Sequence, residues 1–283
     1  AADRYMDAPV FHSYFIASGS RTRDWIVQKL IIDSLEYSQI HHLNIRDINI
    51  DGRPDIFPVS NQSKWIQNST SGFIDHQYYS SFSDASAITH ADLDEDGDVD
   101  LIIAANSGTD LYWLENINYS WTSQPLGSYV GITDLAIADF NHDGHTDIIV
   151  ADAGDSAVYW LENDGFAGFS SHNFNTYDEF YVDLKVHDID LDGFVDVLTS
   201  SSTGMLRFLE SEGGGEIVTN HFNGQQRSVL WDVDGDGDLN IISASDVLHH
   251  YDNRTIHPTN VVGNVPADLL YTFPDHIGDM VLA

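Results

Sequence analysis

A nine-residue acidic motif occurs five times along this chain of 283 residues, and it limits the possible folds more than any other feature. Each copy has Asp or Asn at positions one, three, five and nine, and Gly at position six. The copies start at residues 47, 92, 139, 188 and 232, so consecutive copies lie 45, 47, 49 and 44 residues apart. A period of this length is typical of a repeat architecture whose units are single supersecondary structures.

Strand-like segments surround each motif. A short alternating run precedes the motif and a branched apolar run follows it, as in 133–138 and 148–150. A third apolar segment with an aromatic residue and a more polar fourth segment come next, as in 158–163 and 169–174. Four short strands in a unit of about 45 residues predict one blade of a β-propeller.

The two ends of the chain complete the predicted ring. Residues 267–273 and 278–283 resemble the first and second strands of a blade, and residues 10–16 and 25–30 resemble the third and fourth. The sequence therefore predicts one all-β domain over residues 1–283. We expect a six-bladed β-propeller of four-stranded blades, closed by a composite blade from residues 1–32 and 265–283, because closure removes open sheet edges.

The motif has the chemistry of a calcium loop. Ca²⁺ takes six to eight oxygen ligands in flexible geometry, and alternate carboxylates can point several oxygens at one centre. Mg²⁺ demands a tighter octahedron, and Zn²⁺ favours thiolate and His ligands, which these positions do not supply. A solvated turn is the alternative, because Asp, Asn and Gly favour turns.

The motifs, their period and the Trp-Leu-Glu-Asn segments at 113–116 and 160–163 resemble the FG-GAP/VCBS-type repeat. This repeat builds integrin α-subunit propellers, fungal lectins and many secreted bacterial proteins. The integrin-type Phe-Gly and Gly-Ala-Pro signatures are not visible here, so the bacterial and fungal form fits better. The resemblance implies one Ca²⁺ in each intact loop, up to five in all. By position, the implied ligands are Asp47, Asn49, Asp51, Asp55, Asp92, Asp94, Asp96, Asp100, Asp139, Asn141, Asp143, Asp147, Asp188, Asp190, Asp192, Asp196, Asp232, Asp234, Asp236 and Asn240.

Aromatic residues next to acids and amides are candidates for carbohydrate binding. Sugar sites pair an aromatic face with polar groups, and two third strands offer this combination. Packing of the Trp residues between neighbouring blades is the alternative. The candidate residues are Trp113, Glu115, Asn116, Trp160, Glu162 and Asn163.

A second set of candidates lies near the starts of the predicted first strands, at one mouth of the channel. His42, Tyr129, Tyr181 and Arg227 could supply a base and a cation to a polysaccharide lyase acting on an acidic glycan. An ordinary polar channel mouth is the alternative. The chain has no Gly-rich phosphate loop, nucleophilic Ser elbow or zinc-protease helix motif, so catalysis is not expected.

Charge and composition narrow the partners. The chain has 45 Asp and Glu against 11 Lys and Arg, a net charge of -34, which argues against nucleic acid and anionic membranes. Five bound Ca²⁺ would bring this charge to -24. There is no Cys and no apolar run long enough to insert in a bilayer. We expect a secreted, calcium-stabilised module that binds glycans. The alternatives are the lyase and a scaffold that binds protein partners.

Overall fold

The described part of the chain is built from β-strands. The strands form five four-stranded sheets and one two-stranded sheet. No helix found within that part is long and apolar enough to cross a membrane. The computed structural model describes residues 14–19, 25–30, 40–60, 64–77, 82, 84–117, 120–166, 168–174, 181–189, 191–203, 205–211, 217–223, 227–232, 239–244, 247–251 and 268–272.

Each four-stranded sheet contains four strands that are consecutive in the chain and pair antiparallel with their neighbours. The first sheet holds β3 (Ile40–Arg46), β4 (Asp55–Ser60), β5 (Lys64–Ser69) and β6 (Gly72–Gln77). The second holds β7 (Ala87–Ala91), β8 (Asp100–Ala105), β9 (Asp110–Ile117) and β10 (Ser120–Ser128). The third holds β11 (Ile132–Ala138), β12 (Asp147–Asp152), β13 (Ala157–Asn163) and β14 (Phe169–Asn173).

The fourth sheet holds β15 (Tyr181–His187), β16 (Asp196–Ser201), β17 (Met205–Ser211) and β18 (Ile217–Asn223). The fifth holds β19 (Arg227–Trp231), β20 (Asn240–Ala244), β21 (Val247–Tyr251) and β22 (Asp268–Thr272). The two-stranded sheet pairs β1 (Tyr14–Gly19) with β2 (Trp25–Leu30).

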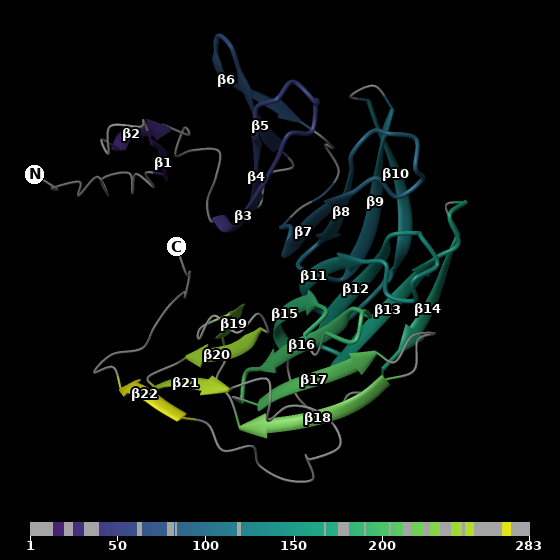
Figure 1. Cartoon of the computed structure of the whole chain (residues 1–283). Coiled ribbons are helices and arrows are strands. Elements are labelled where there is room, and N and C mark those ends of the chain that lie inside the picture. The colour runs from purple at the N-terminus through teal and green to yellow at the C-terminus, as the bar shows by residue number, and fades with distance from the viewer. Residues whose placement is uncertain are drawn as a thin grey trace, which may run out of the picture.

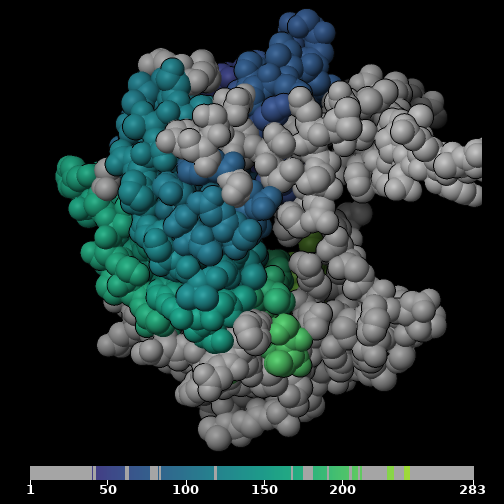
Figure 2. All heavy atoms as spheres, turned by 180° about the vertical axis from the view of Figure 1, so that it is seen from behind, coloured from purple at the N-terminus to yellow at the C-terminus, as the bar shows by residue number. Residues whose placement is uncertain are grey.

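The five sheets follow one another around an arc, as in a propeller (Figure 1). The first strand of each sheet lies on the inner side of the arc and the fourth strand lies on the outer side. The first strands of neighbouring sheets contact one another, with β11 lying against both β7 and β15. Seen from behind, the second and third sheets form one continuous surface (Figure 2).

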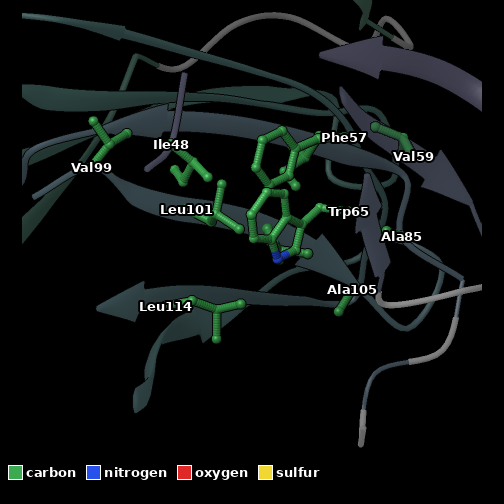
Figure 3. Close-up of a cluster of buried hydrophobic side chains, with 11 residues drawn as sticks. Ile48, Phe57, Val59, Trp65, Ala85, Val99, Leu101, Ala105 and Leu114 are labelled. Atoms are coloured by element: carbon green, nitrogen blue, oxygen red, sulfur yellow. The ribbon is translucent and has the colours of Figure 1, made fainter. Parts of the chain in front are cut away.

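The core lies between neighbouring sheets. One cluster joins Phe57 and Trp65 of the first sheet, and Ile48 between β3 and β4, to residues of the second sheet; Figure 3 shows Phe57 beside Trp65. Leu101 and Ile103 of β8 belong to this cluster, whereas Ile102 and Ala104 of the same strand belong to the next one. The second strands are therefore buried on both faces, which explains their uninterrupted apolar sequences.

The structure confirms the all-β class and the four-stranded units, but it does not show the six-bladed closed ring. The segment predicted as the first strand of a composite blade, 267–273, contains β22 instead. This strand pairs with β21 as the fourth strand of the fifth sheet, so that assignment was wrong. The physical reason is that β21 offers an unpaired edge, which β22 covers. Residues 278–283, and residues 10–13 of the predicted third strand, lie outside the described part. The strand β1 starts at Tyr14 and pairs with β2, as expected of a third and a fourth strand.

Candidate metal centres

The five acidic motifs join the first and second strands of the five sheets. We call them loops one to five, and their bounds are 47–55, 92–100, 139–147, 188–196 and 232–240. Loops one, two and three are fully described, and loop four is described except for Asp190. In loop five, the predicted ligands Asp234 and Asp236 lie outside the described residues, whereas Asp232 and Asn240 lie inside them.

The four described loops share one backbone conformation. Position six has positive φ in each, as its Gly predicts. Position four also has positive φ, which is uncommon for residues other than Gly, and no shared residue type there signalled it in the sequence. The φ angles at position four are 53° (Ile50), 59° (Glu95), 57° (His142) and 61° (Leu191). Those at position six are 84° (Gly52), 95° (Gly97), 96° (Gly144) and 98° (Gly193).

The Asp at position nine clamps each loop to the rest of its sheet. This side chain is 0% exposed in all four loops, at Asp55, Asp100, Asp147 and Asp196. In loop two, Asp100 Oδ2 accepts the Leu93 N–H (3.1 Å) and Asp100 Oδ1 accepts the Asn116 N–H of the third strand (2.8 Å). The same pair of bonds recurs in loops one, three and four. Because each carboxylate oxygen has two lone pairs, these oxygens can still contact a cation.

The Asp at position one closes the turn. One of its oxygens accepts the N–H of the Gly at position six, at 2.7 Å in loop one, 3.1 Å in loop two, 3.0 Å in loop three and 3.1 Å in loop four. The other oxygen divides the loops into two classes. In loops one and three, Oδ1 of Asp47 and of Asp139 accepts the N–H of position five at 3.0 Å. In loops two and four, Oδ1 of Asp92 and of Asp188 is buried and accepts no hydrogen bond from the described residues.

The residue type at position three divides the loops in the same way, wherever that position is described. Loops one and three carry Asn there, and its amide donates to the carboxylate at position five: Asn49 Nδ2 to Asp51 Oδ2 (3.4 Å) and Asn141 Nδ2 to Asp143 Oδ2 (3.0 Å). Loop two carries Asp94, which has no hydrogen to donate. In loops one and three, the partial positive charge of the Asn amide hydrogens offsets the carboxylate at position five. In loop two, a bound cation would play this part.

Among the three fully described loops, loop two gathers its carboxylates most closely. Oxygens of Asp92, Asp94 and Asp100 all lie within 4.8 Å of one another. Burial raises the pKa of Asp94, and the neighbouring charges of Asp96 and Glu115 raise it further. Burial likewise raises the pKa of Asp100, to about 7. The donors are all oxygens, and one of them is buried without a partner, so the site fits a hard divalent cation.

The Trp residues proposed as sugar platforms are part of the core. Trp113 is 1% exposed and Trp160 is 4% exposed. The ring of Trp160 is stacked against His172, with centroids 4.5 Å apart, and lies against Phe140 at 5.2 Å. The expectation that these rings face a sugar was therefore wrong, because each third strand is packed between two sheets.

The Asn residues beside these Trp residues hold the loops together. Asn116 and Asn163 are each 1% exposed. Asn163 Nδ2 donates to the Thr146 carbonyl of its own loop (3.1 Å) and to the Leu93 carbonyl of loop two (2.9 Å). Asn116 Nδ2 donates to the Val99 carbonyl (3.0 Å). These two amides are buried and link a sheet to its loops. The prediction that they contact a carbohydrate was therefore wrong.

The neighbouring Glu115 and Glu162, predicted as carbohydrate contacts, lie beside the acidic loops. Glu162 accepts from Asn141 Nδ2 of loop three (3.1 Å) and pairs with His172 Nε2 (2.8 Å). Glu115 accepts from Gln124 (3.1 Å), and its charge acts on Asp94 of loop two. Each of these carboxylates therefore lies near position three of a loop, Glu162 in loop three and Glu115 in loop two.

The structure does not assemble a lyase site from the predicted residues. Tyr181 is 0% exposed, so its prediction as a ligand contact was wrong. Tyr129 lies edge-on to Tyr159 with ring centroids 5.3 Å apart, and burial raises its pKa to about 12. His42 lies in β3 and Arg227 begins β19, both on first strands.

Polar residues of the first strands connect neighbouring sheets. Asp134 Oδ2 accepts the Leu184 N–H of the next sheet (2.8 Å), and Ser228 Oγ donates to Asp183 Oδ2 of the previous one (3.3 Å). Lys185 Nζ pairs with Asp183 Oδ1 at 2.6 Å. These carboxylates hold the inner side of the arc together.

Known proteins show the same class of repeat. A family model described as FG-GAP-like repeat matches residues 92–150 and 139–199, which contain loops two, three and four. The central part of the chain therefore consists of FG-GAP-like repeats. No match was found among curated proteins.

Two solved structures share the fold. Both are crystal structures of BBS1N in complex with ARL6DN, one soaked with mercury and one with lead. The first match has a TM-score of 0.54 and 15% identity, and it covers 83% of this chain and 66% of the other. The second has a TM-score of 0.55 and 14% identity, with 83% and 68% coverage. This chain thus spans about two thirds of the length of those chains, and at such identity the likeness concerns the fold alone.

Proposed function

We propose that this chain is a calcium-stabilised β-propeller that serves as a scaffold for a protein partner. One observation carries the calcium part. Asp92 and Asp188, at the same position of two different loops, each have a buried carboxylate oxygen with no hydrogen-bond donor among the described residues. A buried oxygen of this kind is costly unless a donor or a cation meets it.

Calcium suits these loops better than other divalent ions. Backbone N–H groups already occupy many carboxylate lone pairs, so the remaining oxygens form an irregular set, which Ca²⁺ accepts and Mg²⁺ does not. A Ca²⁺ in loop two would contact Asp92, Asp94 and Asp100, whose oxygens converge. We extend the proposal to an extracellular setting, where Ca²⁺ is abundant enough for sites of modest affinity.

A protein partner is favoured over a glycan. The Trp side chains that would have formed sugar platforms are buried, and neither of the two similar structures named above is a lectin or a lyase. BBS1N, which shares the fold, is found in complex with ARL6DN. At least one protein with this fold is thus found in complex with a protein, and the same role is proposed here.

Thermal unfolding tests the calcium proposal. The full chain is melted in excess chelator, and again with Ca²⁺ or Mg²⁺ added back. A Ca²⁺ concentration about one hundred times Kd should stabilise the fold by about 2.7 kcal/mol for one site, and Mg²⁺ should do much less. A melting temperature that does not respond to chelator would refute the proposal.

Reconstitution tests the scaffold proposal. A protein that copurifies with the chain from its native source is purified separately and mixed with it, and complex formation is followed by size-exclusion chromatography. The proposal expects a defined complex, and it is refuted if no copurifying protein rebinds while a panel of glycans does.

A further inference from the structure

Loops one to four lie side by side in the described part of the chain and form one face of it. His145 Nδ1 of loop three meets Glu95 Oε1 of loop two at 2.6 Å. The rings of His142 in loop three and Phe194 in loop four lie 5.0 Å apart. Both contacts join position four of one loop to position seven of the next. We use the name loop face for the described residues of loops one to four together with residues 164–166 and 168.

Two apolar residues on the loop face combine a left-handed backbone conformation with exposure to solvent. Ile50 and Leu191 occupy position four, with left-handed φ angles of 53° and 61°. Asn or Gly would adopt this conformation more easily, and β-branched Ile is especially disfavoured there. Both side chains also remain open to solvent, Ile50 at 64% and Leu191 at 56%. The left-handed backbone is shared by position four of every described loop, so the turn holds these two exposed apolar side chains in a fixed orientation on the loop face.

A cavity lies beside Ile50. Its volume is about 510 Å³, and it opens between loops one and two. Apolar side chains of Ile45, Ile50, Pro54 and Val99 form part of its wall, and Arg46 and Asp92 form another part. Ile45 is itself 60% exposed. A cavity of this size and lining can receive an apolar side chain from a partner.

A third apolar residue projects from the turn that follows β13. Phe166 is 89% exposed. Its backbone is fixed, because Asp164 Oδ1 accepts the N–H of Phe166 (2.8 Å) and of Gly168 (2.9 Å). The turn rests on loop three, since the His145 ring leaves no room for a Cβ at Gly165. Phe166 is therefore presented next to loop three.

Most charged residues of the loop face are acidic, and the basic Arg53 of loop one pairs with Asp51 at 3.5 Å. Loop two carries Glu95, Asp96 and Asp98 in addition to the carboxylates that converge in it. The chain as a whole has a net charge of -34. This charge repels a second copy of the chain, a nucleic acid or an anionic membrane, and it attracts a basic protein segment.

We propose that the loop face docks a basic segment of a partner protein, whose apolar side chains contact Ile50, Phe166 and Leu191. The proposal rests on the scaffold function and names the chemistry of the partner. Positive charges on the partner would steer the encounter, and the apolar contacts would hold the complex.

Calorimetric titration with two synthetic peptides tests this proposal. One peptide combines Lys with Leu, and the other has the same length and charge but combines Lys with Ser. The full chain, in Ca²⁺ buffer, should bind the Lys/Leu peptide more tightly. Replacing Ile50→Asn, Leu191→Asn and Phe166→Ser together should weaken that binding by about tenfold or more, because apolar anchors dominate such interfaces. The two Asn substitutions suit the left-handed backbone, so the variant should fold.

The matched control replaces apolar residues elsewhere. Phe73→Ser and Ile74→Asn change β6, where the side chains are 37% and 42% exposed, and should leave peptide binding unchanged. Equal binding of both peptides, or equal losses in the test and control variants, would overturn the proposal and indicate charge attraction only. Chelator melting and partner reconstitution are separate measurements, so a failure here is distinguishable from a failure of the proposed function.

Discussion

Loops two and three are neighbours with the same backbone and different chemistry. In both, an Asp at position nine is buried and accepts two backbone N–H groups. In loop three, both oxygens of Asp139 accept backbone N–H groups, and Asn141 donates to Asp143 and to Glu162. In loop two, Asp92 Oδ1 is buried and accepts no hydrogen bond within the described structure, and position three is the carboxylate of Asp94.

The comparison shows that one amide group changes what a loop requires. The amide of Asn141 supplies two hydrogen bonds to carboxylates, so loop three can form its turn with its own donors. Loop two has no such donor at position three, so its carboxylates need a cation to offset their repulsion. We therefore expect loop two to depend on Ca²⁺ more than loop three does. Loop four should resemble loop two, and loop one should resemble loop three.

The largest effect should come from position nine, which the two loops share. Asp147→Ala leaves the N–H groups of Phe140 and Asn163 without their acceptor in a buried place. Each such loss costs about 1–3 kcal/mol, so the free energy of unfolding should fall by about 2–6 kcal/mol. Asp100→Ala should cost a similar amount in chelator and more in Ca²⁺. Urea unfolding in the two buffers measures both.

The control for position nine is Asp75→Ala on the exposed strand β6, which should change stability little. If Asp100→Ala and Asp147→Ala responded identically to Ca²⁺, the difference between the two loops would be disproved.

A reciprocal exchange at position three should give the next largest effect. Asp94→Asn gives loop two an amide donor and removes a charge, so stability in chelator should rise by about 1 kcal/mol and the gain from Ca²⁺ should shrink. Asn141→Asp should do the opposite in loop three, because Asp143 and Glu162 lose their donor. Unfolding with and without Ca²⁺ measures both variants. Shifts in the same direction would contradict the comparison.

Much of this architecture could be predicted from residue types and spacing. The period of the motif and the branched apolar runs, such as 148–150, located the strands and the four-stranded units. The Gly at position six predicted the turn, as at Gly144 with its φ of 96°. These features depend on residues that are close together in the chain, so residue types and spacing are enough to predict them.

The remaining features depend on packing between distant segments. The clamp from Asp100 to Asn116, and the amide of Asn163 that reaches Leu93, link residues that the sequence separates widely. The burial of Trp113 and Trp160 follows from sheets lying on both sides of a third strand, which residue type alone does not reveal. The pairing of β22 with β21 likewise depends on which edge is open in three dimensions.

A smaller effect should come from pH in metal-free protein. Burial raises the pKa of Asp100 from its ordinary value of 3.8 to about 7. The folded state then binds the proton more tightly than the unfolded state, so this group adds stability at low pH that is lost as pH rises toward and through about 7. Between about pH 6 and pH 8 the loss should be about 1 kcal/mol.

Asp100→Asn cannot titrate, and in chelator it should show a shallower pH dependence of the melting temperature than the parent chain. Ca²⁺ should also flatten the parent's dependence, because the cation favours the ionised carboxylate. An unchanged slope in Asp100→Asn would show that other carboxyl groups carry the pH dependence.

The smallest effect should come from the contact that joins the two loops. Glu95 raises the pKa of His145 above its usual 6.5 by accepting a hydrogen bond from its ring. The stability from this pair is fully present below 6.5 and is lost as pH rises through the raised pKa. Because the pair is exposed to solvent, salt should weaken it. His145→Gln should lower the melting temperature slightly at about pH 6 and not at about pH 9, where the histidine is neutral.

Glu95→Gln should lower the melting temperature by the same amount, and the double variant should lower it no further. If the melting temperature fell equally at both pH values, the His145 ring would act by packing against the turn at Gly165. The ion pair with Glu95 would then not connect the two loops.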